Sequence, residues 1–299
     1  MFSKLAFLPT YPVYASEFLE QCGKSVNIES TILAVSQSGE TADTISAVSC
    51  AQQRAATVLS LTNVIGSTMT RISRVYIGTQ AGPEIGVAAT KTFTSQLSVL
   101  AQLALKLSKK RGKISQDEID CLEENLKKMP DDVDTIVRTQ EGKIKQIAKK
   151  YANSKVFFFL GRGISTATAF EGRLKLMEIA YIPSIAFPAG ESKHGPISLI
   201  EDGFPVVFIC PKDDTHKTVI GNIMEMKARG AHIIAVIEEG DAEIKSLADD
   251  YIEVPKGIPS IISPIPYAIP LQLLAYYTAL EKGFNPDMPR NLAKSVTVK

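Results

Sequence analysis

Short hydrophobic runs alternate with longer amphipathic stretches along the whole chain. Mostly apolar runs of about four to eight residues predict strands in the first half, at 31–36, 56–62 and 74–79. The same pattern predicts strands in the second half, at 155–161, 184–187, 205–210, 232–237 and 251–254. Apolar strands separated by helical segments are typical of parallel sheets covered by helices. We therefore expect an α/β fold with two open, mostly parallel sheets flanked by helices.

Helical periodicity fills the intervals between these strands. The clearest helical patterns begin at about Gly39 and recur at 92–107, 165–182, 215–229 and 267–282. A charged stretch between Lys109 and Ser154 is also helical in pattern, and we expect a break at Pro130 because proline lacks the backbone N–H. The expected segments are a first domain at 1–125, a helical connector at 126–150, a second domain at 151–282 and a C-terminal tail at 283–299.

Composition narrows the class of protein. The chain of 299 residues has 33 Lys plus Arg against 32 Asp plus Glu, and this balance argues against a nucleic-acid-binding role. Its four cysteines form no CxxC pair and it has only three histidines, so we expect neither a disulfide framework nor a metal site. A reducing compartment fits this cysteine usage best.

One uncharged segment, 257–280, is long enough to cross a bilayer. It contains four prolines, and Gln272 interrupts its helical half, so we expect a buried loop that leads into a core helix. The N-terminus carries one lysine and a short apolar run broken at Pro9, which does not suit a signal peptide. We therefore expect a cytoplasmic protein without membrane contact.

The loop at 36–41, between a predicted strand and a helix, is the first candidate site. Ser36, Ser38 and Thr41 supply hydroxyls, and Gly39 allows the backbone to turn closely around a ligand. Free backbone N–H groups at a helix start favour an anion such as a phosphate. The alternative is an ordinary Ser/Thr helix cap, and spacing alone does not separate the two.

Charged residues of the second half supply further candidates. Glu171, Lys175 and Glu178 fall on one helical face, where a carboxylate beside an ammonium can act as a proton-transferring base. The alternative is a solvated ladder of ion pairs. His194 lies in a glycine-flanked loop and is a candidate general acid or base, or a structural residue. Gly161-Arg162-Gly163 is a weaker candidate, in which the arginine holds an anion or pairs across a dimer.

Five segments in the same order carry a family resemblance. They are SQSGETADT at 36–44, PEIGVAATKTFTSQ at 83–96, GRG…FEGRLKLMEIAYI at 161–182, GESKHGP at 190–196 and PRNLAKSVTV at 289–298. Together they resemble the isomerase part of glucosamine-6-phosphate synthase (glutamine–fructose-6-phosphate aminotransferase), which consists of two tandem sugar-isomerase (SIS) domains. The resemblance implies a flavodoxin-like three-layer sandwich for each domain, and it runs from about residue 14 to the C-terminus.

The resemblance also implies roles for individual residues. The sugar phosphate would be held by Ser36, Gln37, Ser38 and Thr41, and the sugar pocket would be lined at Val87 and Ala89. The implied catalytic residues are Glu178 for proton transfer between C1 and C2, Lys175 to tune that step, His194 to open the ring and Lys294 to form an imine with fructose 6-phosphate. In the family this histidine reaches the site from the neighbouring subunit, which implies a homodimer. Arg290 would anchor the tail, and no cofactor or metal is implied.

Departures from the family pattern leave alternatives open. The chain starts after the family's first strand and its Cys-Gly-Thr-Ser loop, so we expect a first SIS domain truncated at its N-terminus. Ala89 stands where the family has a sugar-contacting serine, and a glutaminase domain is not part of the sequence. The resemblance implies an isomerase that converts fructose 6-phosphate to glucose 6-phosphate, or to glucosamine 6-phosphate if a separate glutaminase supplies ammonia. A non-catalytic phosphosugar-binding module and a glucosamine-6-phosphate deaminase are the alternatives.

Overall fold

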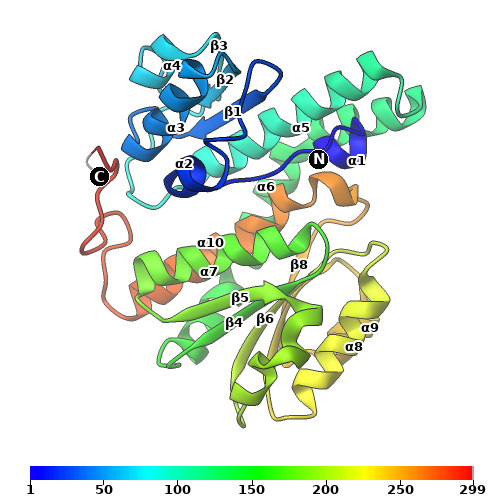
Figure 1. Cartoon of the computed structure of the whole chain (residues 1–299). Coiled ribbons are helices and arrows are strands. Elements are labelled where there is room, and N and C mark those ends of the chain that lie inside the picture. The colour runs from blue at the N-terminus through cyan, green and yellow to red at the C-terminus, as the bar shows by residue number, and fades with distance from the viewer. Residues whose placement is uncertain (298–299) are drawn as a thin grey trace. The chain divides into compact units, whose positions relative to one another are not determined.

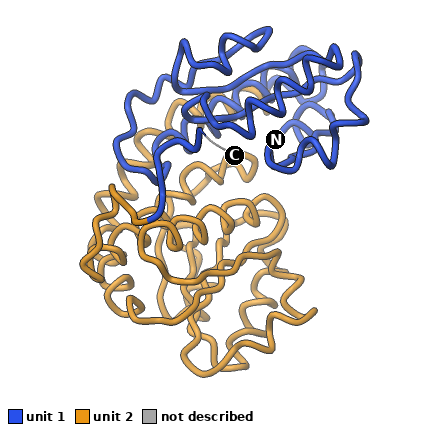
Figure 2. The backbone as a smooth tube through the Cα atoms, turned by 60° about the vertical axis from the view of Figure 1, so that its left-hand side comes forward, with its two compact units in different colours: residues 1–116, 291–299 blue, residues 117–290 orange. Residues whose placement is uncertain are grey.

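The computed structural model describes residues 1–297 (Figure 1). The chain forms two compact units, one of Met1–Gln116 together with Asn291–Lys299 and one of Asp117–Arg290 (Figure 2). Residues 298–299 of the expected tail lie outside the described residues. The C-terminal tail is therefore divided, because its last residues group with the first unit and the residues before them group with the second.

The first unit contains a parallel three-stranded sheet of order β1-β2-β3. Its strands are β1 (Thr31–Ser36), β2 (Thr57–Thr62) and β3 (Val75–Gly78). All three predicted strands of the first half are confirmed. In the register of the sheet, Ser36 at the end of β1 lies opposite Thr62 at the end of β2. The loops that leave these strands therefore start from one edge of the sheet, where open α/β sheets bind ligands.

Helices and a small hydrophobic core support this sheet. The helical segments of the first unit are α1 (Phe2–Leu5), η1 (Ala15–Glu17), α2 (Phe18–Gln21), α3 (Ala42–Gln53), α4 (Thr68–Ile72) and α5 (Lys91–Arg111). The core includes apolar side chains of α2, α3, α4 and the first two strands, among them Val48, Ala51, Val58 and Met69. This packing fixes the start of α3 directly after β1.

The second unit contains a parallel five-stranded sheet of order β5-β4-β6-β7-β8. Its strands are β4 (Phe157–Gly161), β5 (Ser184–Pro188), β6 (Pro205–Cys210), β7 (His232–Glu238) and β8 (Asp250–Val254). All five predicted strands are confirmed. Every residue of β4 and β6 is buried, which agrees with the continuous apolar runs in the sequence.

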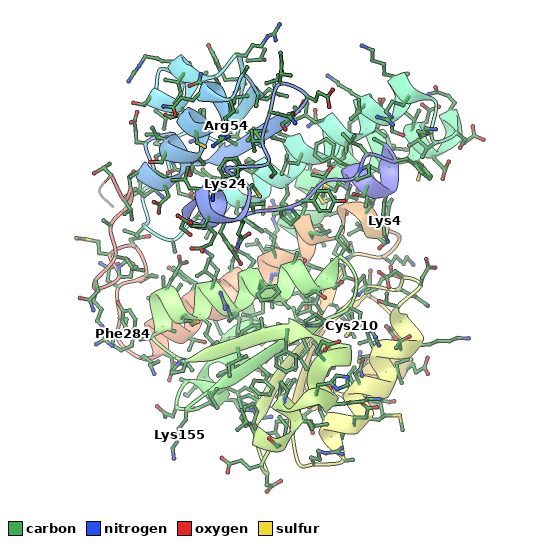
Figure 3. The ribbon with its side chains drawn as sticks, in the orientation of Figure 1. Lys4, Lys24, Arg54, Lys155, Cys210 and Phe284 are labelled. Atoms are coloured by element: carbon green, nitrogen blue, oxygen red, sulfur yellow. The ribbon has the colours of Figure 1, made fainter. Side chains whose placement is uncertain are left out.

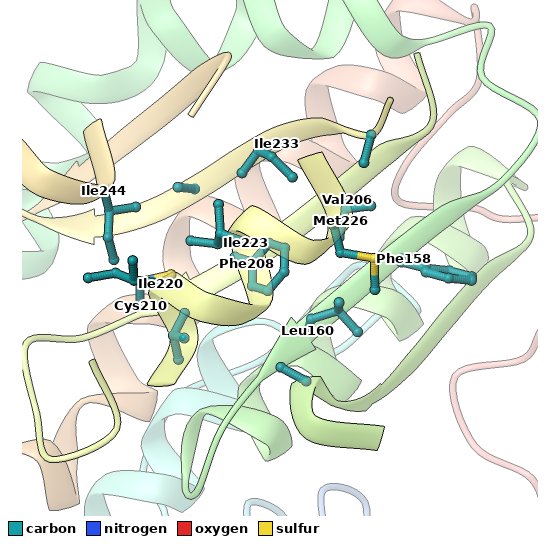
Figure 4. Close-up of a cluster of buried hydrophobic side chains, with 14 of the residues drawn as sticks. Phe158, Leu160, Val206, Phe208, Cys210, Ile220, Ile223, Met226, Ile233 and Ile244 are labelled. Carbon is teal, nitrogen blue, oxygen red and sulfur yellow. The ribbon is translucent and has the colours of Figure 1, made fainter. Parts of the chain in front are cut away.

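Helices cover both faces of this sheet and make three layers (Figure 1). They are α7 (Ser165–Ala180) and α10 (Pro264–Glu281) on one face, and α8 (His216–Lys227) and α9 (Ala242–Leu247) on the other. Three short turns complete the unit, η2 (Ala189–His194), η3 (Pro196–Leu199) and η4 (Ser260–Ile262). Side chains alternate along β4, so Phe158 joins the core beneath α8 (Figure 4) and Phe159 lies against Gly172 of α7. The sandwich therefore holds α7 closely against the sheet.

The predicted break at Pro130 is wrong. A single helix, α6, runs through it from Gln116 to Tyr151. Pro130 is exposed, so water can satisfy the carbonyl that lacks a proline N–H partner. Buried residues on both sides, such as Met129 and Ile136, hold the helix in one piece. Tertiary packing outweighs the local cost of the proline.

The uncharged segment at 257–280 begins as a loop that contains η4 and continues as α10, as expected for a loop that leads into a core helix. Twelve of the residues of α10 are buried, from Pro264 to Ala279, although Pro270 lies inside the helix. Among the described residues, no helix is both long and apolar enough to cross a membrane.

Candidate functional site

The 36–41 loop folds into a compact turn at the end of β1. Ser36 is buried, with 7% of the residue exposed. Its hydroxyl accepts a hydrogen bond from the Gly39 N–H at 3.0 Å and lies 3.2 Å from the Thr41 hydroxyl. Gly39 has φ +68°, and a Cβ there would lie 2.1 Å from the hydroxyl oxygen of Ser67. Only glycine suits this position, because it combines a left-handed backbone with a close approach.

The N-terminus of α3 meets the tail of the chain. The Ala42 N–H donates to the Val296 carbonyl at 3.1 Å, and the Ser38 and Ser295 hydroxyls are 3.2 Å apart. Thr41 occupies the N-cap position, but among the described residues its side chain accepts no capping hydrogen bond from α3. An ordinary threonine cap is therefore not what this loop provides. It presents hydroxyls and a helix N-terminus, which suit an anion.

Gln37 is held through its backbone. Its carbonyl accepts the Asn63 N–H at 3.1 Å and the Thr62 hydroxyl at 3.3 Å. Glu40 receives the Thr68 N–H at 2.7 Å, which ties the loop to the start of α4. The pKa of Glu40 is lowered, chiefly by this hydrogen bond. The loop is therefore braced by the end of β2 and by the start of α4.

The candidate imine-forming lysine lies in the same unit. Lys294 Nζ donates to the Gly86 carbonyl at 2.5 Å and lies 3.7 Å from Glu84 Oε2. Val87 and Ala89 follow in the same irregular segment and are both partly buried. The structure thus brings Lys294 together with the segment that carries the two predicted pocket residues.

Glu84 is a residue that our reading of the sequence missed. Burial alone would raise its pKa, but hydrogen bonds from Thr92 and Thr90 and the charge of Lys294 outweigh burial and lower the pKa. The signal in the sequence was a carboxylate shortly before a threonine-rich helix start, a pattern typical of helix capping. Nothing local to that pattern points to Lys294, more than 200 residues away.

In the second unit, α7 carries a group of three charges, of which Lys175 and Glu171 are buried. Lys175, whose side chain is 4% exposed, lies 2.6 Å from Glu178 and 3.5 Å from Glu171. The side chain of Glu171 is 8% exposed, whereas that of Glu178 is 22% exposed. The solvated-ladder alternative is therefore wrong for Lys175. Of the two carboxylates, Glu178 is the one more exposed to solvent.

His194 is exposed at the end of η2, the turn that follows β5. Lys193 beside it pairs with Glu225 of α8 at 2.7 Å. Arg162 donates to Asn222 of α8 at 3.3 Å and lies so close to Gly190 that a Cβ there would be 2.7 Å from Nη2. Within this unit, Arg162 thus braces the turn that presents His194.

The first residues of the tail are anchored in the second unit. The Arg290 N–H donates to the Tyr181 hydroxyl at 2.7 Å, and its guanidinium lies 4.3 Å from the centre of the Tyr181 ring. Phe284, on the segment after α10 (Figure 3), packs edge-to-face on the same ring. The anchoring role expected of Arg290 agrees with these contacts.

No cluster of three or more His, Cys, Asp or Glu side chains suited to a metal ion occurs within residues 1–297. The polar groups described above include hydroxyls, carboxylates, amines and one exposed imidazole. Such groups can bind an anion, transfer a proton next to a carbonyl and form an imine.

Comparison with known proteins identifies relatives over the whole chain. The SIS domain model matches residues 1–106 and 150–282. The glutamine–fructose-6-phosphate aminotransferase [isomerizing] of Thermococcus kodakarensis is 44% identical over 299 residues, which is 100% of this chain and 49% of the relative. The enzyme of the same name from Pyrococcus horikoshii is 45% identical over 98% of this chain and 48% of its own length. The chain thus spans about half the length of these curated relatives.

A solved structure agrees with this assignment. The C-terminal domain of glucosamine-fructose-6-phosphate aminotransferase from Francisella tularensis has a TM-score of 0.89 and 33% identity, covering 96% of this chain and 81% of that one. A glucosamine-6-phosphate deaminase from Thermotoga maritima shares the fold, with a TM-score of 0.78 at 22% identity over 99% of this chain and 84% of that one. The chain belongs to the SIS-domain family and corresponds to the isomerase part of the glutamine–fructose-6-phosphate aminotransferases.

Proposed function

We propose that this chain is a phosphosugar isomerase that converts fructose 6-phosphate to glucose 6-phosphate. One observation carries the proposal: Lys294 and the hydroxyls of the 36–41 loop belong to one connected arrangement, because Ser295 next to Lys294 lies 3.2 Å from Ser38. An open-chain hexose 6-phosphate has an anion at one end and a carbonyl near the other. The loop suits the anion and the lysine amine suits the carbonyl.

The proposed roles follow the chemistry of each group. Ser36, Gln37, Ser38 and Thr41 hold the phosphate, and the pocket is lined at Val87 and Ala89. Lys294 forms an imine at the C2 carbonyl with release of one water, and ammonia, where it is supplied, displaces the lysine from that imine. Without ammonia, water hydrolyses the imine and restores the ketone and the free amine, so glucose 6-phosphate forms from the free ketose. In either case Glu178 takes a proton from C1 and returns it to C2, Lys175 sets the electrostatics of that carboxylate, and His194 opens the sugar ring. Glucosamine 6-phosphate is the product where a glutaminase domain or subunit supplies ammonia.

A homodimer is part of this proposal. Phe170, Leu174 and Met177 of α7 are 39%, 37% and 40% exposed and recur at i, i+4 and i+7, which places an apolar stripe on the outside of the helix that carries Glu178. A second copy of the chain is the occupant that we propose for this stripe, with His194 acting in the site of its neighbour.

Trapping with borohydride tests the reaction. We expect fructose 6-phosphate followed by borohydride to give a reduced adduct on Lys294, found by peptide mass spectrometry, and glucose 6-phosphate to form without the reductant. Lys294→Arg should abolish the adduct, whereas Lys24→Arg, a change at an exposed lysine of the first unit, should alter neither the adduct nor the formation of glucose 6-phosphate (Figure 3). Binding without adduct or turnover would instead establish a sugar-phosphate-binding module. Ammonia release from glucosamine 6-phosphate without isomerisation would establish a deaminase.

Subunit complementation tests the shared site. His194→Asn and Glu178→Gln should each be inactive alone. If His194 acts in the neighbouring subunit, an equal mixture refolded together should regain about one quarter of the wild-type activity, because half of the dimers are hybrids with one intact site. If His194 acts within its own subunit, the mixture should stay inactive, and the proposal of a shared site is then refuted.

A further inference from the structure

We propose that Glu84 is a positioning residue that holds the amine of Lys294 in place for imine formation. The inference rests on the proposed function, which makes Lys294 the amine that reacts. Neither the sequence pattern nor the family resemblance assigned a role to Glu84. What points to that role is the set of contacts around its carboxylate in the first unit.

The carboxylate of Glu84 is immobilised. Its side chain is 5% exposed. It accepts hydrogen bonds from the Thr90 N–H at 2.7 Å, the Thr90 hydroxyl at 3.1 Å and the Thr92 hydroxyl, and Thr92 itself is fully buried. Because these donors belong to the start of the long helix α5, the negative charge occupies a fixed position in the unit.

Lys294 is held by that fixed charge on one side and by a carbonyl on another. Its Nζ lies 3.7 Å from Glu84 Oε2 and donates to the Gly86 carbonyl at 2.5 Å. An ammonium has three N–H donors, so a further one is open to a ligand, and the side chain is 31% exposed. The next residue, Ser295, contacts Ser38 of the 36–41 loop. Glu84 thus sets where the amine lies relative to the loop proposed to bind phosphate.

The charge balance of imine formation explains why a carboxylate beside Lys294 suits the reaction. A lysine ammonium and a ketone combine to a protonated imine and one water: the N–C bond forms, the carbonyl C–O bond breaks, and two protons from the nitrogen leave with the oxygen. The nitrogen therefore carries one positive charge before and after the step. A fixed carboxylate beside it stabilises both states, and it restrains the amine without having to move between them.

The test compares Glu84→Gln with Thr92→Val. The first variant removes the charge and retains most of the shape, whereas the second removes one hydrogen bond to the carboxylate and keeps the charge. The restraint on the amine is measured without sugar, through the rate at which Lys294 reacts. The reaction is reductive methylation with formaldehyde and cyanoborohydride, followed by peptide mass spectrometry. We expect Glu84→Gln to raise the methylation rate of Lys294 at least about five-fold relative to Lys24, and Thr92→Val to change it less than two-fold.

Trapping with fructose 6-phosphate and borohydride gives the second readout. Glu84→Gln should lower the yield of the Lys294 adduct about ten-fold while the dissociation constant for inorganic phosphate changes less than three-fold. Equal effects of both variants on methylation and on phosphate binding would mean that Glu84 only supports the loop, and would overturn the inference. An unchanged methylation rate in Glu84→Gln would also overturn it. If the wild type gives no adduct but Glu84→Gln still frees Lys294, the proposed function fails and the positioning by Glu84 stands.

Discussion

Replacement of Lys175 by methionine tests how much its ion pairs on α7 contribute to the stability of the second unit. The ammonium is almost completely buried and lies 2.6 Å from Glu178 and 3.5 Å from Glu171. Methionine fills a similar volume but removes the ammonium that lies between the two carboxylates of α7. Removal of one partner from a buried ion pair costs about 3–5 kcal/mol. Because Glu178 remains partly hydrated, we expect the lower end, about 3 kcal/mol.

A surface ion pair provides the matched control. Lys150 lies 2.7 Å from Asp250, but its side chain is 47% exposed. The same substitution there, Lys150→Met, should cost about 0–1 kcal/mol, since exposed ion pairs contribute little. For a unit of this size, about 1 kcal/mol lowers Tm by roughly 2–4 °C. Thermal unfolding followed by circular dichroism should therefore show a loss of about 6–12 °C for Lys175→Met and at most about 4 °C for Lys150→Met.

A third variant separates charge from packing. Lys175→Met combined with Glu171→Gln and Glu178→Gln has no buried charge left in this cluster, so it should regain most of the lost stability. Equal losses for Lys175→Met and Lys150→Met would refute the reasoning, because burial would then make no difference to the cost. A triple variant as unstable as Lys175→Met would show that the side chain of Lys175 matters for its packing rather than for its charge.

Two further predictions concern the first unit. Gly39→Ala should destabilise the protein by more than about 1 kcal/mol and weaken phosphate binding. Gly66 has φ +87° and open space around it, so Gly66→Ala should show only the smaller backbone cost. Urea unfolding measures the stability of both variants, and equilibrium dialysis measures their binding of phosphate. The lowered pKa of Glu84 implies a contribution to stability that is fully present above the unfolded-state pKa of about 4.3 and is lost as the pH falls through the folded-state value. The unfolding free energy of the wild type should therefore fall more steeply below about pH 5 than that of Glu84→Gln, and parallel pH profiles would contradict this.

Local pattern determined most of the fold in advance. The continuous apolar runs at β4 and β6 can only be buried between helices, so the strands and the α/β class follow from composition and spacing. The failure at Pro130 has a clear reason. A proline acts on one turn of backbone, whereas the continuity of α6 depends on buried side chains such as Met129 and Ile136, whose partners are distant in the sequence.

The candidate site, like the fold, was only partly predictable from the sequence. The sequence by itself determined that hydroxyls and a glycine lie between a strand and a helix at 36–41, and that Lys175 has carboxylates at helical spacing. Only the tertiary structure decided that Lys175 is buried and that Glu84 lies beside Lys294. Spacing along a helix is a local property, but burial and pairing depend on which distant segments pack together. Electrostatic interactions change greatly in strength with burial, so the chemistry of these residues was settled by packing.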